Sequence, residues 1–195
     1  KARPETTSKH LRGLKEGYGD DDEDDRAAVP TLFGAPLNPN TDAVPGLFGK
    51  LVRYLQQRGV SCNGLFERQV SSKEVQELHA KVITEGDQIQ LHNFKNPFVV
   101  GEMLKFYLAS LPEPLLTFSL YDYFILITDM LHYKTQLSSI RFLLHTSLPK
   151  GFRACVKALL TLLNRISLSA NTNSMSADKL AAIFAPYFLR PETES

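Results

Sequence analysis

The chain has 195 residues, of which 43% are hydrophobic and 12 are Phe, so it can bury the core of one globular domain. Its 22 basic and 21 acidic residues leave a formal net charge of +1, which argues against nucleic-acid binding through bulk positive charge. No run of about 18 apolar residues indicates a membrane span, and Cys62 and Cys155 lack the spacing of a metal site.

The first 29 residues differ in composition from the rest of the sequence. Basic residues scattered over Lys1–Lys15 precede an unbroken acidic block, Asp20–Asp25, and few apolar side chains are available for a core. We therefore expect residues 1–29 to be a charged, flexible N-terminal extension and residues 30–195 to be the folded domain. The alternative is a charged arm that docks on a basic surface of the domain or on a partner.

Helical periodicity begins near Pro45. Apolar residues at helical spacing predict helices from about Pro45 to Arg58, from Ser71 or Ser72 to Glu85, and from about Pro97 to Leu111. Between the last two helices, residues 88–95 allow at most one edge of extended structure. The five residues 64–68, Gly-Leu-Phe-Glu-Arg, lie between the first two helices and are predicted to form a tight turn.

Four further helices are predicted in the C-terminal half. They cover residues 119–131, 135–148 and 151–168, followed by a polar loop over 169–174 and a final helix that begins near Ser176. The helix over 151–168 has a wide apolar stripe, so we expect it to be central to the core. The sequence shows no convincing pattern of paired strands, and the predicted fold class is therefore all-α, a helical bundle.

Several short motifs, in their order along the chain, resemble the Rho-family GTPase-activating (Rho-GAP) domain. The motifs are Phe33–Leu37, Val44–Pro45, Gly64–Phe66, Leu104–Leu108, Leu111–Leu115 and Met175–Pro186. The resemblance covers about Phe33 to Pro191 and implies a bundle of about seven to nine helices that binds a Rho, Rac or Cdc42-type small GTPase. It also implies that GTP and Mg²⁺ belong to that partner and that the domain has no cofactor of its own.

The resemblance draws attention to the residue after the Gly-apolar-Phe triplet, where active members of this family place an arginine. A trans-acting arginine stabilises the charge that develops on the transferred phosphoryl group, which accelerates hydrolysis by about 10³–10⁵. This chain has Glu67 at that position, and a carboxylate repels phosphate. Arg68 follows, either as a displaced arginine finger or as a surface arginine paired with Glu67 or Glu74.

Two other positions depart from the pattern that the resemblance implies. The family often has a Lys and then, four residues later, an Arg in the third helix, and an Asn before Leu-Ala in the final helix. This chain keeps Lys105 but has Ala109 and Lys179 at the other two positions. Lys105 is either a snorkelling lysine or a contact to the GTPase or to the Glu67 turn. The partner-binding residues that we expect are Lys105, Ala109, Lys179, Asn173 and Pro186.

We expect a Rho-family GTPase-binding module, regulatory or scaffolding, with impaired or absent activating activity (a pseudo-GAP). It is expected not to be an enzyme, and stimulation of GTP hydrolysis in trans is left open. One alternative is an active GAP with Arg68 as its finger, and another is an interaction or membrane-tethering module without GTPase binding. We expect a cytoplasmic monomer without metal or nucleic acid, with peripheral membrane contact through its partner or flanking regions.

Overall fold

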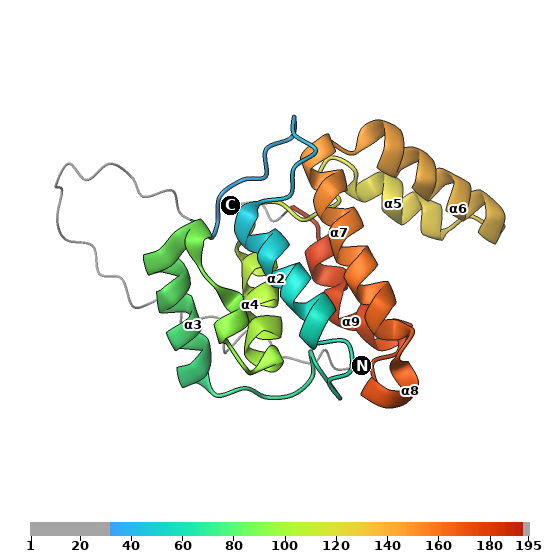
Figure 1. The fold of residues 1–195 in the computed structure, drawn as a ribbon. Helices are drawn as coiled ribbons and strands as arrows, with labels where there is room; N and C mark the ends of the chain where they lie inside the picture. The colour runs from blue at the N-terminus through green and yellow to red at the C-terminus, as the bar shows by residue number, and fades with distance from the viewer. Residues whose placement is uncertain (1–31, 193–195) are drawn as a thin grey trace, which may run out of the picture. The chain divides into compact units, whose positions relative to one another are not determined.

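This computed structural model describes residues 32–192 of the chain. The described residues contain eight α-helices and no strand (Figure 1). The all-α prediction is therefore confirmed. The charged extension predicted for residues 1–29 lies outside the described residues.

The N-terminal half contains α2 (Gly46–Arg58), α3 (Ser72–Glu85) and α4 (Pro97–Ser110), close to the predicted ranges. Helix α4 begins at a proline, whose missing N–H is not needed in the first turn, and the Asn96 side chain accepts a hydrogen bond from the Phe98 N–H at 3.2 Å.

Residues 88–95, for which the sequence allowed at most one edge of extended structure, form no strand. This connection instead contains two 3₁₀ turns, Gly86–Gln88 and Leu91–Asn93. Ile89 and Leu91 are buried in the core. Their apolar character therefore reflects packing beneath neighbouring helices, and it does not reflect strand pairing.

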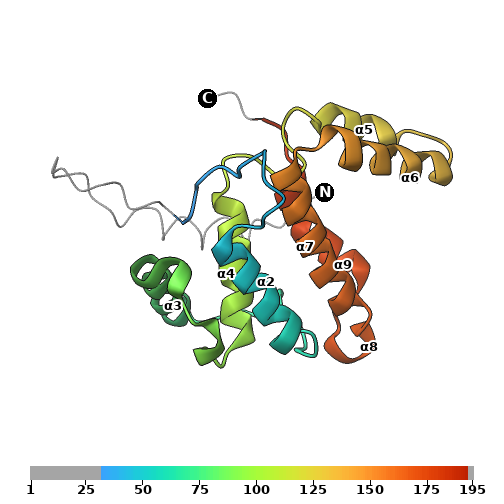
Figure 2. The same ribbon diagram turned by 45° about the horizontal axis from the view of Figure 1, so that its top comes forward.

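The C-terminal half contains five helices: α5 (Tyr121–Thr128), α6 (Tyr133–Phe142), α7 (Lys150–Ser167), α8 (Ala170–Asn173) and α9 (Ala177–Phe188). Helices α5 and α6 form a hairpin that extends away from α2 and α4 (Figures 1 and 2). Both are shorter than predicted, and α6 continues into a π-helical turn, Leu143–Ser147. The predicted polar loop over 169–174 contains the short helix α8.

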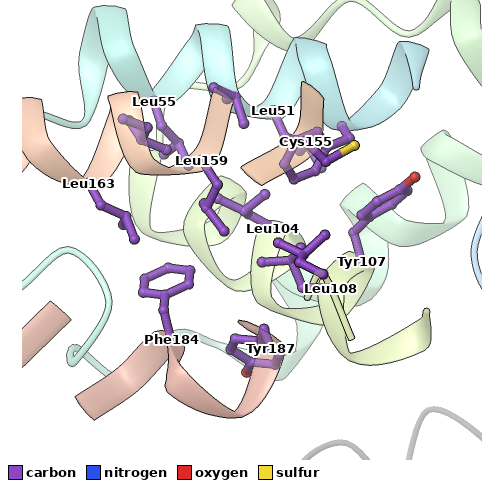
Figure 3. Packing of buried hydrophobic residues seen from close by; sticks show 14 of the residues in the cluster. Leu51, Leu55, Leu104, Tyr107, Leu108, Cys155, Leu159, Leu163, Phe184 and Tyr187 are labelled. Atoms are coloured by element: carbon purple, nitrogen blue, oxygen red, sulfur yellow. The ribbon is translucent and has the colours of Figure 1, made fainter. Parts of the chain in front are cut away.

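Helix α7 is central, as its apolar stripe predicted. It packs against both α2 and α9, and its Leu159, Leu162 and Ile166 side chains are completely buried. Figure 3 shows Leu51 and Leu55 of α2 approaching the core from one side and Phe184 of α9 from the other. Helices α2 and α7 thus lie on one side of the core and α9 on the opposite side.

Candidate functional site

After α2 the chain makes the predicted tight turn around Gly64, which has a φ of 66° and open space where a Cβ would lie. The N–H groups of Glu67 and Arg68 both donate to the Gly64 carbonyl at 3.0 Å. Leu65 and Phe66 are buried and anchor the turn, whereas Glu67 and Arg68 are exposed. The turn therefore presents these two side chains at the surface of the domain.

Asn173, at the end of α8, forms hydrogen bonds with the turn and its neighbours from the buried side. Its carbonyl accepts from the Gly64 N–H at 2.9 Å, and its side-chain amide donates to the carbonyls of Val60 and Ile166. Its amide oxygen accepts from the Met175 N–H at 2.8 Å, and the residue is fully buried. The structure therefore uses Asn173 as an internal support, and the partner contact expected for it stays a prediction.

Lys105 contacts the same turn from α4. Its ammonium group donates to the Phe66 carbonyl at 3.1 Å and pairs with the Glu102 carboxylate at 2.6 Å. Only 9% of the residue is exposed, so the turn contact is the alternative that the structure shows. Glu102 was not singled out from the sequence, although its i, i+3 spacing from Lys105 is a signal for such a pair.

The Glu67 carboxylate forms an ion pair with Lys179 of α9. The Oε2–Nζ distance is 3.2 Å, and the two side chains remain 42% and 48% exposed. An exposed pair of this kind contributes roughly 0.2–1 kcal/mol to stability. The two unusual residues therefore partly neutralise each other's charge, and the pair is weak enough to open on contact with a partner.

Arg68 points to a different neighbour. Its guanidinium carbon lies 5.1 Å from the centre of the Phe98 ring, at the start of α4. Within residues 32–192 it forms no ion pair with Glu67 or Glu74. Glu67 pairs with Lys179, and Glu74 accepts from the Asn96 side chain. This ring contact is not visible in the sequence, since thirty positions separate the two residues.

The remaining two expected partner-binding residues lie farther along α4 and α9. Ala109 is exposed one helical turn beyond Lys105 on α4, and it offers no polar group. Pro186 is exposed on α9, two turns beyond Lys179 and therefore on the same helix face. The structure thus brings Glu67 and Lys179 into contact and joins Lys105 to the turn through the Phe66 carbonyl.

The site is a surface and not a cavity. An apolar hollow of about 530 Å³ lies between α7, α9 and the α5–α6 hairpin, but the side chains of the turn do not line it. Among residues 32–192, no cluster of three or more His, Cys, Asp or Glu is placed to hold a metal ion. No helix in this range is long and apolar enough to cross a membrane.

Comparison with known proteins places this arrangement in a family. A family model for the RhoGAP domain matches residues 45–193. The chain is 38% identical over 171 residues to Rho GTPase-activating protein gacM of Dictyostelium discoideum, covering 84% of this chain and 19% of that protein. It is 31% identical over 165 residues to unconventional myosin-IXa of Rattus norvegicus, covering 83% and 6%. The chain therefore spans about a fifth or less of these relatives.

Solved structures show the same fold. The crystal structure of human Rho GTPase activating protein 15 aligns with a TM-score of 0.75 and 26% identity, covering 84% of this chain and 80% of that one. The BH domain from Graf, the GTPase regulator associated with focal adhesion kinase, aligns with a TM-score of 0.67 and 24% identity, covering 76% and 80%.

These findings correct one expectation and confirm another. The expectation that the chain is not of an enzymatic type is wrong as stated, because matched relatives are named Rho GTPase-activating proteins, a class that stimulates GTP hydrolysis. The resemblance read from the ordered motifs is confirmed by the family model and by the shared fold. The chain belongs to the RhoGAP domain family.

Proposed function

We propose that this domain regulates a Rho-family small GTPase, which it binds through the surface around Glu67, Lys105 and Lys179, and that it stimulates GTP hydrolysis only weakly. The observation that carries the proposal is the Glu67–Lys179 ion pair at the exposed tip of the turn. GTP and Mg²⁺ remain with the GTPase in this proposal. A cytoplasmic monomer fits such a role.

The expected weakness follows from the charges at the turn. An arginine finger acts because a permanently charged, multiply donating group meets the developing negative charge of the transferred phosphoryl group. The Glu67 carboxylate repels that charge, and Lys179 is engaged in offsetting Glu67. Lys105 is engaged as well, by the Phe66 carbonyl and the Glu102 carboxylate. Neither Lys105 nor Lys179 therefore offers an unpaired ammonium group to the phosphoryl group.

Arg68 supports a second candidate function, an active GAP with a displaced finger. Its side chain is exposed, and its one described contact is the Phe98 ring. A cation–π contact at an exposed site is worth about 0.5–1 kcal/mol, so binding a GTPase can release the guanidinium at little cost.

Single-turnover GTP hydrolysis by Rho, Rac and Cdc42 proteins, with the domain added in excess, separates the two candidates. We expect the wild-type domain to accelerate hydrolysis far less than the roughly thousandfold or more of an arginine finger. Glu67→Arg is expected to increase the acceleration by at least about tenfold, because it places a guanidinium at the tip of the turn. Arg68→Ala is expected to change nothing.

Strong acceleration by the wild type that Arg68→Ala abolishes and Glu67→Ala leaves intact would instead establish Arg68 as the finger. Binding is measured separately, by calorimetry against each GTPase loaded with a non-hydrolysable GTP analogue. If no member of the panel binds, GTPase recognition is refuted and the interaction-module alternative takes its place.

A further inference from the structure

All charged side chains of helices α2 and α7 are basic. Neither helix contains an Asp or a Glu residue. Together they carry seven basic residues, none of which forms an ion pair within residues 32–192. The basic residues are Lys50, Arg53, Arg58, Lys150, Arg153, Lys157 and Arg165.

The two helices lie side by side and run in the same direction (Figure 1). At the start of α7 the Gly151 N–H donates to the Pro39 carbonyl, shortly before α2, and beyond its end Asn173 donates to Val60, shortly after α2. The outer sides of the two helices are therefore neighbours. Two of the seven cations bind backbone carbonyls: Lys50 donates to those of Asp87 and Ile89, and Arg153 donates to that of His145. We call the outer side of α2 and α7 the basic face.

Helical geometry places the basic residues of α7 together on its outer side. At about 100° per residue, all four fall within an arc of about 120°. The opposite arc holds the buried Cys155, Leu159 and Ile166. Lys157 and Arg165 are both exposed, as is Arg53 on α2, so these cations are accessible to a partner.

Exposed leucines accompany these cations. Leu168, the residue after α7, is 79% exposed and continues the outer arc that contains Lys157. Leu160 is 46% exposed at the edge of this arc, where it lines the hollow between α7, α9 and the hairpin. The α5–α6 hairpin, which leads into α7, exposes further large apolar side chains, among them Leu131 at 96% and Tyr133 at 70%. The apolar face of α7 is buried in the core, so only isolated Leu and aromatic side chains are available to enter the interfacial region of a bilayer beside the cations.

We propose that the basic face is a docking surface for an anionic lipid bilayer. The negative surface potential of such a bilayer attracts all the cations of the face, so no cation needs an individual counter-charge. Exposed leucine side chains can enter the headgroup region. The Glu67 turn contacts Lys179 of α9, and α9 lies across the core from α2 and α7 (Figure 3). A domain docked in this way leaves its GTPase-binding site accessible.

Co-sedimentation of the full chain with vesicles tests this surface. We expect binding to mixed phosphatidylcholine–phosphatidylserine vesicles, weakening with added salt, and little binding to pure phosphatidylcholine. Each basic residue near an anionic surface raises binding by about fivefold, so Lys157→Glu combined with Arg165→Glu is expected to lower the partition coefficient by about 25-fold or more. Leu168→Gln is expected to lower it by roughly threefold, since less apolar area is buried.

The matched control is Lys73→Glu combined with Lys95→Glu, which changes the net charge equally at two exposed positions outside α2 and α7. This variant is expected to keep the wild-type affinity within about threefold. An equal loss in the control pair would show that net charge alone drives binding and would refute the basic face as the docking surface. Failure of the wild type to prefer anionic vesicles over neutral ones would refute lipid docking itself.

Discussion

At the scale of single residues, the sequence shows which side chains are present at the site, but it does not show which residues they contact. Glu67 is visible in the sequence as the residue after Gly-Leu-Phe. Its ion pair with Lys179 joins positions 112 residues apart. Asn173 is a similar case, since nothing in the polar sequence around it indicates that its amide is buried behind the turn.

Asn173→Ala is expected to lower the free energy of unfolding by about 1–3 kcal/mol. The substitution leaves the Val60 carbonyl and the Met175 N–H without the side-chain partner that they have now, and the Ile166 carbonyl keeps the Ser169 N–H. Urea denaturation measures the change. Asn63→Ala, which removes an exposed hydrogen bond to Ser174 in the same region, is the control and should cost well under 1 kcal/mol. Equal losses would show that the support attributed to Asn173 is absent.

At the scale of elements, α3 packs into the core through the buried Leu78 and Val82, and His79 adds a contact with two aromatic rings. His79 stacks on Phe33 at a ring separation of 5.0 Å and meets Phe106 of α4 edge-on at 5.1 Å. Burial between these rings lowers the pKa of His79 from its ordinary value of 6.5, because the charged imidazolium loses solvation. The histidine therefore acts as an apolar packing group at neutral pH.

Stability should fall on mild acidification for this reason. Below pH 6.5 the unfolded chain protonates this histidine more readily than the folded chain does, so protons favour unfolding until the lower folded pKa is passed. The urea midpoint, measured from pH 7.5 down to pH 5.5, is expected to decrease. His79→Phe, which keeps the ring packing, should flatten this dependence, whereas His92→Gln at an exposed position should not. An unchanged slope in His79→Phe would contradict the assignment.

The element boundaries were predictable only in part. Helices α2, α3 and α4 begin close to the predicted positions because local signals, such as Pro97 with its Asn96 cap, act within one turn. The 3₁₀ turns after α3, the early ends of α5 and α6 and the short helix α8 were missed. Their limits depend on how the chain packs around α7, and periodicity within a short window does not contain that information.

At the scale of the whole molecule, α7 has one side buried in the core and an opposite side that carries charge at the surface. Its inner leucines join the side chains of α2, α4 and α9 in one core. Its outer arc carries Lys157 and Arg165 in the surface that we propose for lipid. One helix thereby supports the turn from inside and supplies a second interaction surface on the outside.

Two leucine truncations, one in α7 and one at the residue that follows it, test this division. Leu159→Ala removes a completely buried side chain and is expected to lower the free energy of unfolding by about 2–5 kcal/mol. Leu168→Ala removes a side chain that is 79% exposed and is expected to change it by less than about 0.5 kcal/mol. Thermal or urea unfolding measures both, and similar losses for the two variants would contradict the central position of α7.

The sequence by itself determined the helical class, the ordered family motifs, the tight turn at Gly64 and the acidic residue that follows it. Each helix, turn and motif arises from residues within a few positions of one another, so local periodicity and turn chemistry suffice to predict them, and the order of the motifs is read directly along the chain. Only the tertiary structure decided that Glu67 pairs with Lys179, that Lys105 reaches the Phe66 carbonyl, and that α2 and α7 pack side by side. Those contacts join residues 39 or more positions apart, and helix packing selects them.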